Sequence, residues 1–265
     1  MVVRDYIRER FFPHLWCPGC GHGIVMGAMI RSIENLGIRK NDIVVVSGIG
    51  CSSRIVGYLD FHTLHAIHGR ALAFATGLKL SRPELIVIAP MGDGDALALG
   101  GNHLIHAARR NIDITAIIMN NNNYGMTGGQ YSPTSRIGDL AATAPYGNID
   151  RPFDIVKLAI GAGASFVART TTYHVASMIA ILEKAIKHRG LSVVEVLSQC
   201  PTYFGRMNKF PSAVDILNYY KTHTTPIGGK AKTPDLIETG IFIEEERPEY
   251  CAEYNKIIKK ASKGS

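Results

Sequence analysis

The chain has 265 residues, of which 46% are hydrophobic and 19% charged, enough apolar material for one large α/β domain or two small ones. Its formal net charge is +7, but no basic segment is interleaved with aromatic residues, so nucleic-acid binding is not expected. No apolar run reaches the roughly 18 residues of a membrane span, and the segment Met1 to Tyr6 lacks a signal peptide's apolar region. We therefore expect a cytoplasmic protein without membrane contact.

Short apolar runs alternate along the chain with segments of helical periodicity. Strands are expected at residues 43–47, 85–89, 114–118, 166–168 and 192–197, and helices at 24–36, 71–80, 96–110, 153–160 and 175–188. This alternation predicts a doubly wound, mainly parallel sheet. The segments 124–135 and 136–152 are rich in turn residues and are expected to be irregular. Beyond Tyr220 the chain becomes polar and proline-punctuated, which predicts an α/β domain over 1–220 and a C-terminal extension over 221–265 that packs on a partner subunit.

Polar clusters follow two of the predicted strands. Gly92-Asp93-Gly94-Asp95 follows the strand at 85–89, and Asn120 to Asn123 follows the strand at 114–118. The helix between them makes a βαβ unit, whose two strands run parallel. Both clusters should therefore meet at the carboxyl edge of the sheet, where α/β folds bind ligands.

The residue types in these clusters indicate their chemistry. Carboxylate, amide and backbone oxygens are hard donors that suit Mg²⁺ bound together with phosphate. Gly92 and Gly94 allow the backbone to approach a ligand closely, and Asp95 is expected to cap the following helix. The plainer alternative is an ordinary strand–turn–helix corner, with the glycines needed only for the turn.

The five cysteines suggest a second centre at the same edge. Cys51 and Cys200 each follow a predicted strand, and Cys17 and Cys20 precede a helix that leads into a strand. In a parallel sheet these four residues gather at the carboxyl edge, where four thiolates suit zinc or an iron–sulfur cluster. The spacing, one Cys-x-x-Cys pair and two single cysteines, favours the cluster modestly. Cys251, in the extension, is expected to be a free thiol.

The pairing of Gly-Asp-Gly with the asparagine cluster resembles the thiamine diphosphate motif. This resemblance implies that Mg²⁺ is held by Asp93, Asn121 and the main-chain oxygen of Asn123. Five motifs occur in order over about residues 14 to 205. They are Cys17-Pro18-Gly19-Cys20-Gly21-His22-Gly23, Gly48-Ile49-Gly50-Cys51-Ser52, His68-Gly69-Arg70, Gly92-Asp93-Gly94-Asp95 with Gly101-Asn102-His103, and Tyr124-Gly125-Met126-Thr127. Together they resemble the β subunit of 2-oxoacid:ferredoxin oxidoreductases.

The resemblance implies a thiamine diphosphate-binding fold and an oxidative decarboxylation of a 2-oxoacid with coenzyme A. Its [4Fe-4S] cluster would be held by Cys17, Cys20, Cys51 and Cys200, and would pass electrons one at a time to ferredoxin. Contacts with thiamine diphosphate are implied for Ile49, Gly50, Cys51, Ser52, His68, Gly69, Arg70, Gly94, Asp95, Gly125 and Met126. The activating glutamate is expected on a partner α subunit, in an αβ or (αβ)₂ assembly.

The substrate is predicted from fewer residues. Phe61 to Arg70 and Gly125 to Gln130 look most like the 2-oxoglutarate enzymes, which form succinyl-CoA and CO₂, and Arg54 could bind the second carboxylate of 2-oxoglutarate. Pyruvate or a broad range of 2-oxoacids is the alternative. Two further classes stay open: a non-catalytic electron-transfer or zinc-stabilised interaction subunit, and a non-oxidative thiamine enzyme, which needs no cluster.

Overall fold

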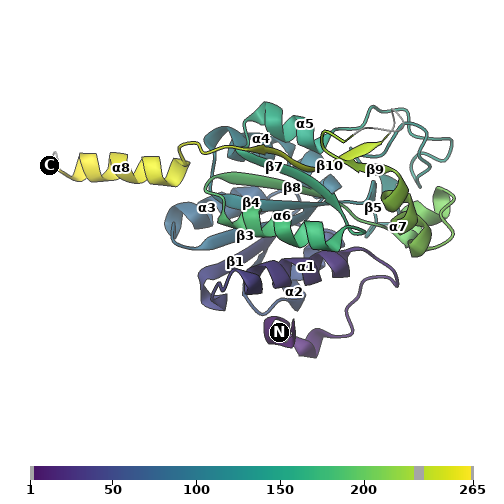
Figure 1. The fold of residues 1–265 in the computed structure, drawn as a ribbon, viewed down its shortest axis with the longest axis horizontal. Helices are drawn as coiled ribbons and strands as arrows, with labels where there is room; N and C mark the ends of the chain where they lie inside the picture. Colours follow the sequence, from purple (N-terminus) through teal and green to yellow (C-terminus); the bar gives the residue numbers. More distant parts are fainter. Residues whose placement is uncertain (1–2, 230–235, 264–265) are drawn as a thin grey trace.

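The fold is organised around one large twisted sheet (Figure 1). The computed structural model describes residues 3–229 and 236–263, and within them eight strands pair in the order β2-β1-β3-β4-β8-β7-β10-β9. The strands are β1 (Ile43–Ser47), β2 (His62–His65), β3 (Ile86–Gly92), β4 (Ile114–Asn120), β7 (Phe166–Thr171), β8 (Leu191–Leu197), β9 (Thr224–Pro226) and β10 (Ile237–Glu244). A separate hairpin pairs β5 (Asn123–Tyr124) with β6 (Gln130–Tyr131).

Helices cover both faces of the sheet. The helices that the structure describes are α1 (His22–Asn35), α2 (Ile55–Tyr58), α3 (Ala71–Ser81), α4 (Gly101–Arg110), α5 (Ile155–Ala162), α6 (Val175–Lys187), α7 (Ala213–Thr222) and α8 (Tyr250–Lys263), of which α1 to α6 pack on the sheet. Short 3-10 turns lie at Val3–Tyr6, Glu9–Phe11, Lys40–Asp42 and Ser52–Arg54, and π turns at Asp95–Leu99 and Pro201–Gly205. No helix in the described ranges is long and apolar enough to cross a membrane.

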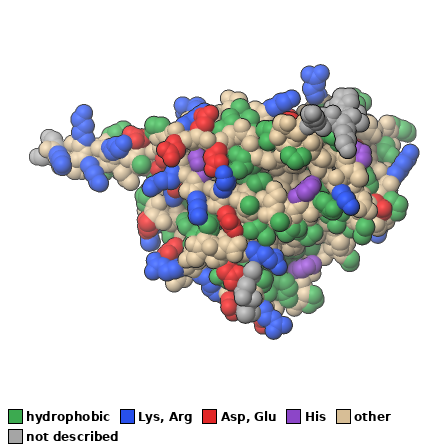
Figure 2. Space-filling view, in the orientation of Figure 1, with side chains coloured by type: hydrophobic (Ala, Val, Ile, Leu, Met, Phe, Trp, Pro, Cys, Tyr) green, Lys and Arg blue, Asp and Glu red, His purple; other side chains and the backbone are tan. Residues whose placement is uncertain are grey.

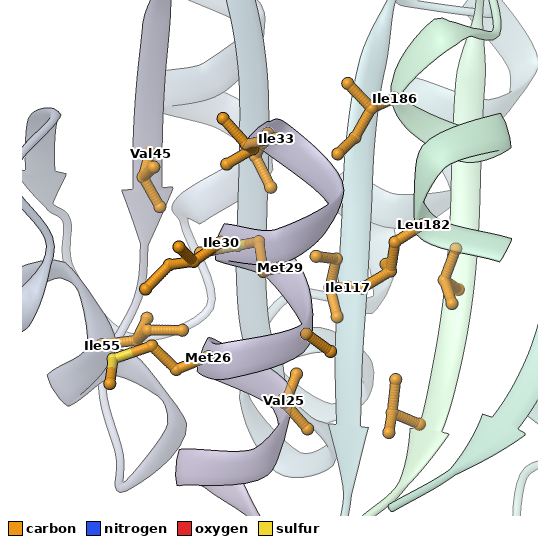
Figure 3. Packing of buried hydrophobic residues seen from close by; sticks show 14 of the residues in the cluster. Val25, Met26, Met29, Ile30, Ile33, Val45, Ile55, Ile117, Leu182 and Ile186 are labelled. Carbon is orange, nitrogen blue, oxygen red and sulfur yellow. The ribbon is translucent and has the colours of Figure 1, made fainter. Parts of the chain in front are cut away.

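Two apolar layers hold the helices to the sheet. One packs α1, α2 and α6 against one face, and the other packs α3, α4 and α5 against the opposite face. Figure 3 shows the first layer, where Met29 of α1 lies beside Ile117 of β4. Every residue of β4 and β8 is buried because both faces of these strands are covered. From β2 to β7 all strand pairs are parallel, so the predicted doubly wound, mainly parallel sheet is confirmed.

The helix predicted at 96–110 is divided. Residues Asp95–Leu99 form a π turn, and the regular helix α4 begins only at Gly101. Gly100 marks the division, since a side chain on it would lie 2.5 Å from the Asp95 carbonyl oxygen and 3.0 Å from that of Gly69. The wider turn thus lets the loop around Gly69 come close to the chain just after Asp95.

The segment after Tyr220 contains more structure than its polar sequence predicted. Strand β10 pairs antiparallel with β7, and β9 pairs with β10. Helix α8 projects from the body of the molecule at the left of Figure 1. Cys251 at its start is free and 3% exposed, and burial raises the pKa of its thiol to about 12.

Candidate functional site

The two polar clusters meet at one cavity. Asp93 follows β3 directly, Asn121 and Asn123 follow β4, and all three side chains belong to residues that line the cavity. The cavity lies at the carboxyl ends of the parallel strands, where the βαβ argument placed it. Its walls contain two aspartates and, among the described residues that line it, no glutamate.

Asp93 is the carboxylate at the base of the cavity. Its side chain is buried, and its Oδ2 accepts hydrogen bonds from the hydroxyls of Ser132, at 2.6 Å, and Thr134, at 2.5 Å. Burial raises the pKa of this carboxyl group to about 6, although both hydroxyls act in the opposite direction. A cation bound beside Asp93 would reverse that rise by favouring the ionised form.

The asparagine segment supplies neutral oxygen donors. The Asn123 backbone N–H donates to Asn121 Oδ1 at 3.4 Å, and Asn123 Nδ2 donates to the Asn121 carbonyl at 3.0 Å. Asn123 Oδ1 is buried and has no hydrogen-bond partner in the part of the chain that the structure describes. A carboxylate, amide oxygens and an unsatisfied buried oxygen fit a small hard cation such as Mg²⁺. Here the unsatisfied atom is the side-chain oxygen of Asn123, whereas the resemblance implied its main-chain oxygen.

Asp95, the second aspartate that lines the cavity, is buried and joins three loops. Its Oδ1 accepts from the backbone N–H groups of Ile49, at 3.2 Å, and Gly69, at 2.6 Å, and lies 2.5 Å from His68 Nδ1. The prediction that Asp95 caps the following helix is therefore wrong: the turn begins after Gly94 without a side-chain cap. The carboxylate instead satisfies backbone groups of two neighbouring loops.

Two glycines allow close approaches in the wall of the cavity. A side chain on Gly94 would lie 2.1 Å from the Tyr124 ring, and one on Gly125 would lie 3.3 Å from Asn123 Oδ1. The residues for which thiamine diphosphate contact was implied divide into two groups. Those that line the cavity are Ile49, Gly50, Cys51, Ser52, His68, Gly94, Asp95, Gly125 and Met126. Gly69 and Arg70 are not among the described residues that line it, and Arg70 Nη1 donates to the His68 carbonyl at 2.9 Å.

Four cysteines line a second cavity beside the first. Cys17, Cys20, Cys51 and Cys200 come from three separate parts of the chain and share this cavity, which measures about 230 Å³. Trp16 anchors one wall, since its Nε1 donates to the Cys51 carbonyl at 2.7 Å. The two cavities share the lining residues His22, Cys51, Asn121, Gly125 and Met126.

Two thiols of this cavity, those of Cys20 and Cys51, favour their neutral form. Burial raises the pKa of Cys20 to about 12 and that of Cys51 to about 11, and the neighbouring cysteines add to both rises. Burial also lowers the pKa of His22 to about 4. Among the described residues, no group of three or more His, Cys, Asp or Glu side chains is arranged as a ready-made ion site. The donor set nevertheless fits a cluster, because iron would favour the thiolates that burial alone disfavours.

Arg54 lies on the cysteine side. It is exposed, it lines the cysteine cavity and not the first one, and its charge acts to lower the pKa of Cys51.

Ser132 and Thr134 were missed at the sequence level. They lie in the segment 124–135, whose composition indicated only a loop. The run Ser132-Pro133-Thr134-Ser135 could have pointed to a hydroxyl-rich turn, but its partner Asp93 is 39 positions from Ser132, and no local pattern reports such a contact.

Comparison with known proteins agrees with this geometry. Residues 48–196 match the family model "Thiamine pyrophosphate enzyme, C-terminal TPP binding domain". This match defines the class of protein, a thiamine diphosphate enzyme.

Full-length relatives define the family more narrowly. The chain is 47% identical to "2-oxoglutarate synthase subunit KorB" of Methanocaldococcus jannaschii, over 96% of both chains. The KorB subunit of Archaeoglobus fulgidus is 48% identical, over 98% of this chain and 96% of its own. A solved structure of 2-oxoglutarate:ferredoxin oxidoreductase from Magnetococcus marinus, with 2-oxoglutarate, coenzyme A and succinyl-CoA bound, aligns with TM-score 0.90 and 34% identity, covering 99% of this chain and 91% of that one. The chain belongs to the family of β (KorB) subunits of 2-oxoglutarate:ferredoxin oxidoreductases.

Proposed function

We propose that this chain is the cofactor-binding subunit of an enzyme that converts 2-oxoglutarate and coenzyme A to succinyl-CoA and CO₂, with electrons passing to ferredoxin. One observation carries the proposal: the cavity of Asp93 and Asn121 shares a wall with the cavity of the four cysteines. Electrons released at a decarboxylation site would have to reach a one-electron acceptor, so the two should be neighbours, as these cavities are. The relatives named above support the choice of 2-oxoglutarate.

Asp93, Asn121 and Asn123 would hold Mg²⁺ and, through it, the diphosphate of thiamine diphosphate. When bound, thiamine diphosphate supplies the carbanion chemistry that removes CO₂ from a 2-oxoacid. Asp95 fixes the loops of Ile49 and Gly69 around the cavity, and Gly94 leaves room beside the Tyr124 ring. The chain's own residues would thus bind and orient the cofactor.

Cys17, Cys20, Cys51 and Cys200 would hold a [4Fe-4S] cluster that supplies one-electron transfer. Cys51 belongs to both cavities, so the cluster ligand would also be part of the cofactor wall. Arg54, beside the cysteines, would meet the second carboxylate of 2-oxoglutarate. Pyruvate or another 2-oxoacid is the alternative substrate if Arg54 does not reach it.

The active enzyme would be a heteromer, αβ or (αβ)₂, in the cytoplasm. The cavity has no glutamate among its described lining residues, which supports an activating glutamate from an α subunit. Helix α8 supports the proposal that the extension, residues 221–265, packs on a partner subunit. Beyond the body it exposes Tyr254, Ile257 and Ile258 on one side and carries lysines along its length (Figures 1 and 2).

The test is anaerobic purification together with the α subunit, then analysis of iron, sulfide and thiamine and an electron-acceptor assay. About four irons per chain, bound thiamine diphosphate and coenzyme A-dependent reduction by 2-oxoglutarate would support the whole proposal. Preference for pyruvate would overturn only the substrate. Zinc in place of iron, or no thiamine diphosphate, would overturn the redox mechanism.

A further inference from the structure

A hydroxyl-rich turn lies against the proposed cation site. Residues Ser132 to Ser135 close on themselves, because Ser132 N–H donates to Ser135 Oγ at 2.8 Å and Ser135 N–H donates to the Ser132 carbonyl at 3.0 Å. The side chains of Ser132, Thr134 and Ser135 are buried. Buried hydroxyl groups need hydrogen-bond partners, and here they find them on Asp93 and on the asparagine segment of the proposed cation site.

The proposed cation site has two arms: Asp93, which follows β3, and the asparagines Asn120 to Asn123 at the end of β4. The turn contacts the Asp93 arm through a single carboxylate oxygen. Both the Ser132 and the Thr134 hydroxyls meet Asp93 Oδ2, and they lie 3.0 Å from each other. Because two hydroxyls converge on one carboxylate oxygen, the carboxylate cannot rotate without breaking both hydrogen bonds. The other oxygen, Oδ1, is therefore held in a fixed direction.

The same turn contacts the asparagine arm. Asn122 Nδ2 donates to the Thr134 carbonyl at 2.6 Å, and Ser135 Oγ donates to the Asn122 carbonyl at 2.6 Å. Asn122 has a φ of +57°, a conformation that asparagine tolerates better than most residues. These hydrogen bonds fix the backbone between the two proposed ligands, Asn121 and Asn123.

Thr134 also reaches the end of strand β4. Its Oγ1 lies 2.9 Å from Asn120 Oδ1, and Asn120 Nδ2 donates to Glu195 Oε1 at 2.8 Å. The carboxylate of Glu195 thereby fixes the Asn120 amide with its oxygen toward Thr134. Thr134 has one hydroxyl hydrogen, so it bonds the two arms with different groups: the hydroxyl donates to Asp93 Oδ2, and the carbonyl accepts from Asn122 Nδ2.

We propose that Ser132 and Thr134 are positioning residues for the cation: they hold Asp93 Oδ2 so that Oδ1 faces the metal, and they keep the asparagine arm at a matching distance. This inference rests on the proposed function. Partners that orient a metal ligand typically change metal affinity by roughly 10–100-fold when removed. A turn that only filled space would be served as well by valine or alanine.

The test uses the chain assembled with its α subunit and measures the Mg²⁺ concentration that gives half-maximal binding of thiamine diphosphate, by calorimetric titration. Thr134→Val keeps the shape of the side chain and removes its hydroxyl, whereas Thr134→Ser keeps the hydroxyl. Ser132→Ala removes the second hydroxyl. Thr143→Val is the matched control, because Thr143 is exposed and its hydroxyl accepts only the Tyr131 N–H among the hydrogen bonds of the described residues.

Thr134→Val should raise the half-saturating Mg²⁺ concentration about tenfold or more, Ser132→Ala should act in the same direction, and Thr134→Ser and Thr143→Val should stay close to wild type. Thermal stability without Mg²⁺ is measured in parallel. A loss of stability with unchanged Mg²⁺ dependence would overturn the inference, as would a Thr134→Ser variant as impaired as Thr134→Val. If the wild type binds no thiamine diphosphate at any Mg²⁺ concentration, the proposed function itself fails.

Discussion

Asp95 Oδ1 accepts a hydrogen bond from the backbone N–H of Gly69, at 2.6 Å. Asp95 follows β3, whereas Gly69 lies between the edge strand β2 and helix α3. The same oxygen accepts from Ile49, after β1. One buried carboxylate therefore ties together the ends of three elements around the cavity.

Replacing Asp95 by alanine should destabilise the chain. It leaves the buried N–H of Gly69 and the partly buried N–H of Ile49 without their acceptor, and an unsatisfied buried group costs about 1–3 kcal/mol. We expect a decrease of about 2–4 kcal/mol in the free energy of unfolding, measured by urea denaturation. Asp95→Asn keeps an acceptor and should lose about half as much. Equal losses in both variants would contradict the role of the hydrogen bonds.

Gly69→Ala adds only one methyl group, but it should lower the free energy of unfolding strongly. Gly69 has a φ of +74°, and an added Cβ would lie 2.5 Å from the Leu99 carbonyl carbon. Strain and backbone displacement should cost more than about 3 kcal/mol. Gly77→Ala in helix α3 is the matched control, because nothing lies within 4 Å of its added Cβ, and it should stabilise the helix by about 0.5–1 kcal/mol. Similar urea midpoints for the two variants would contradict the prediction.

The parallel part of the fold could be predicted because its strands are marked locally. β1, β4 and β8 are short apolar runs between turn residues, and their predicted positions agree with the structure to within about two residues. Parallel topology then fixed where Asp93, Asn121 and the four cysteines would gather. The site followed from the order of the elements alone.

The remainder depends on contacts between distant residues. Strand β10 was missed because Gly240, with a φ of +132°, and a register shift between Ile241 and Ile243 break its alternating pattern. The end of β7 beyond residue 168 was missed because it is polar. Its charged residue Arg169 is buried only because it pairs with Glu195. Ser132 and Thr134 carry no local signal of their contact with Asp93. Each case involves a partner that only the folded chain supplies.

Replacing any of the four cysteines that line the second cavity should reduce the bound iron, whereas replacing the fifth cysteine, Cys251, should not. Cys200→Ser should remove most of the bound iron, because a serine oxygen is a poorer ligand than a thiolate for iron–sulfur clusters. Cys251→Ser is the control, since Cys251 is buried at the start of α8, and it should retain wild-type iron. Iron and sulfide analysis after anaerobic purification checks both. Equal iron in the two variants would exclude Cys200 as a ligand.

His188 should make the chain less stable in mild acid. Burial lowers the pKa of His188 below its usual value of 6.5, although nearby acidic groups act in the opposite direction. The unfolded chain then binds a proton at a higher pH than the folded chain, so stability falls as the pH drops below about 6.5. His188→Gln should flatten this part of the profile of thermal midpoint against pH. An unchanged slope in the variant would assign the effect to other groups.

Glu195→Ala should destabilise the chain strongly because it leaves a buried charge. Arg169 Nε donates to Glu195 Oε2 at 2.6 Å, with the two side chains 13% and 4% exposed. Removing one partner of such a pair typically costs about 3–5 kcal/mol. We expect the lower part of that range, because Arg169 keeps a hydrogen bond to Asp154 at 2.7 Å.

The double variant Arg169→Met, Glu195→Leu separates the burial of an unpaired charge from the value of the pair itself. Two apolar side chains of similar size should recover most of the lost free energy of unfolding, since buried ion pairs often contribute little beyond their own desolvation. Urea denaturation of the wild type, Arg169→Met, Glu195→Leu and the double variant closes a thermodynamic cycle. A double variant as unstable as Glu195→Ala would instead mean that the Glu195–Asn120 hydrogen bond, at the end of β4, carries the stability.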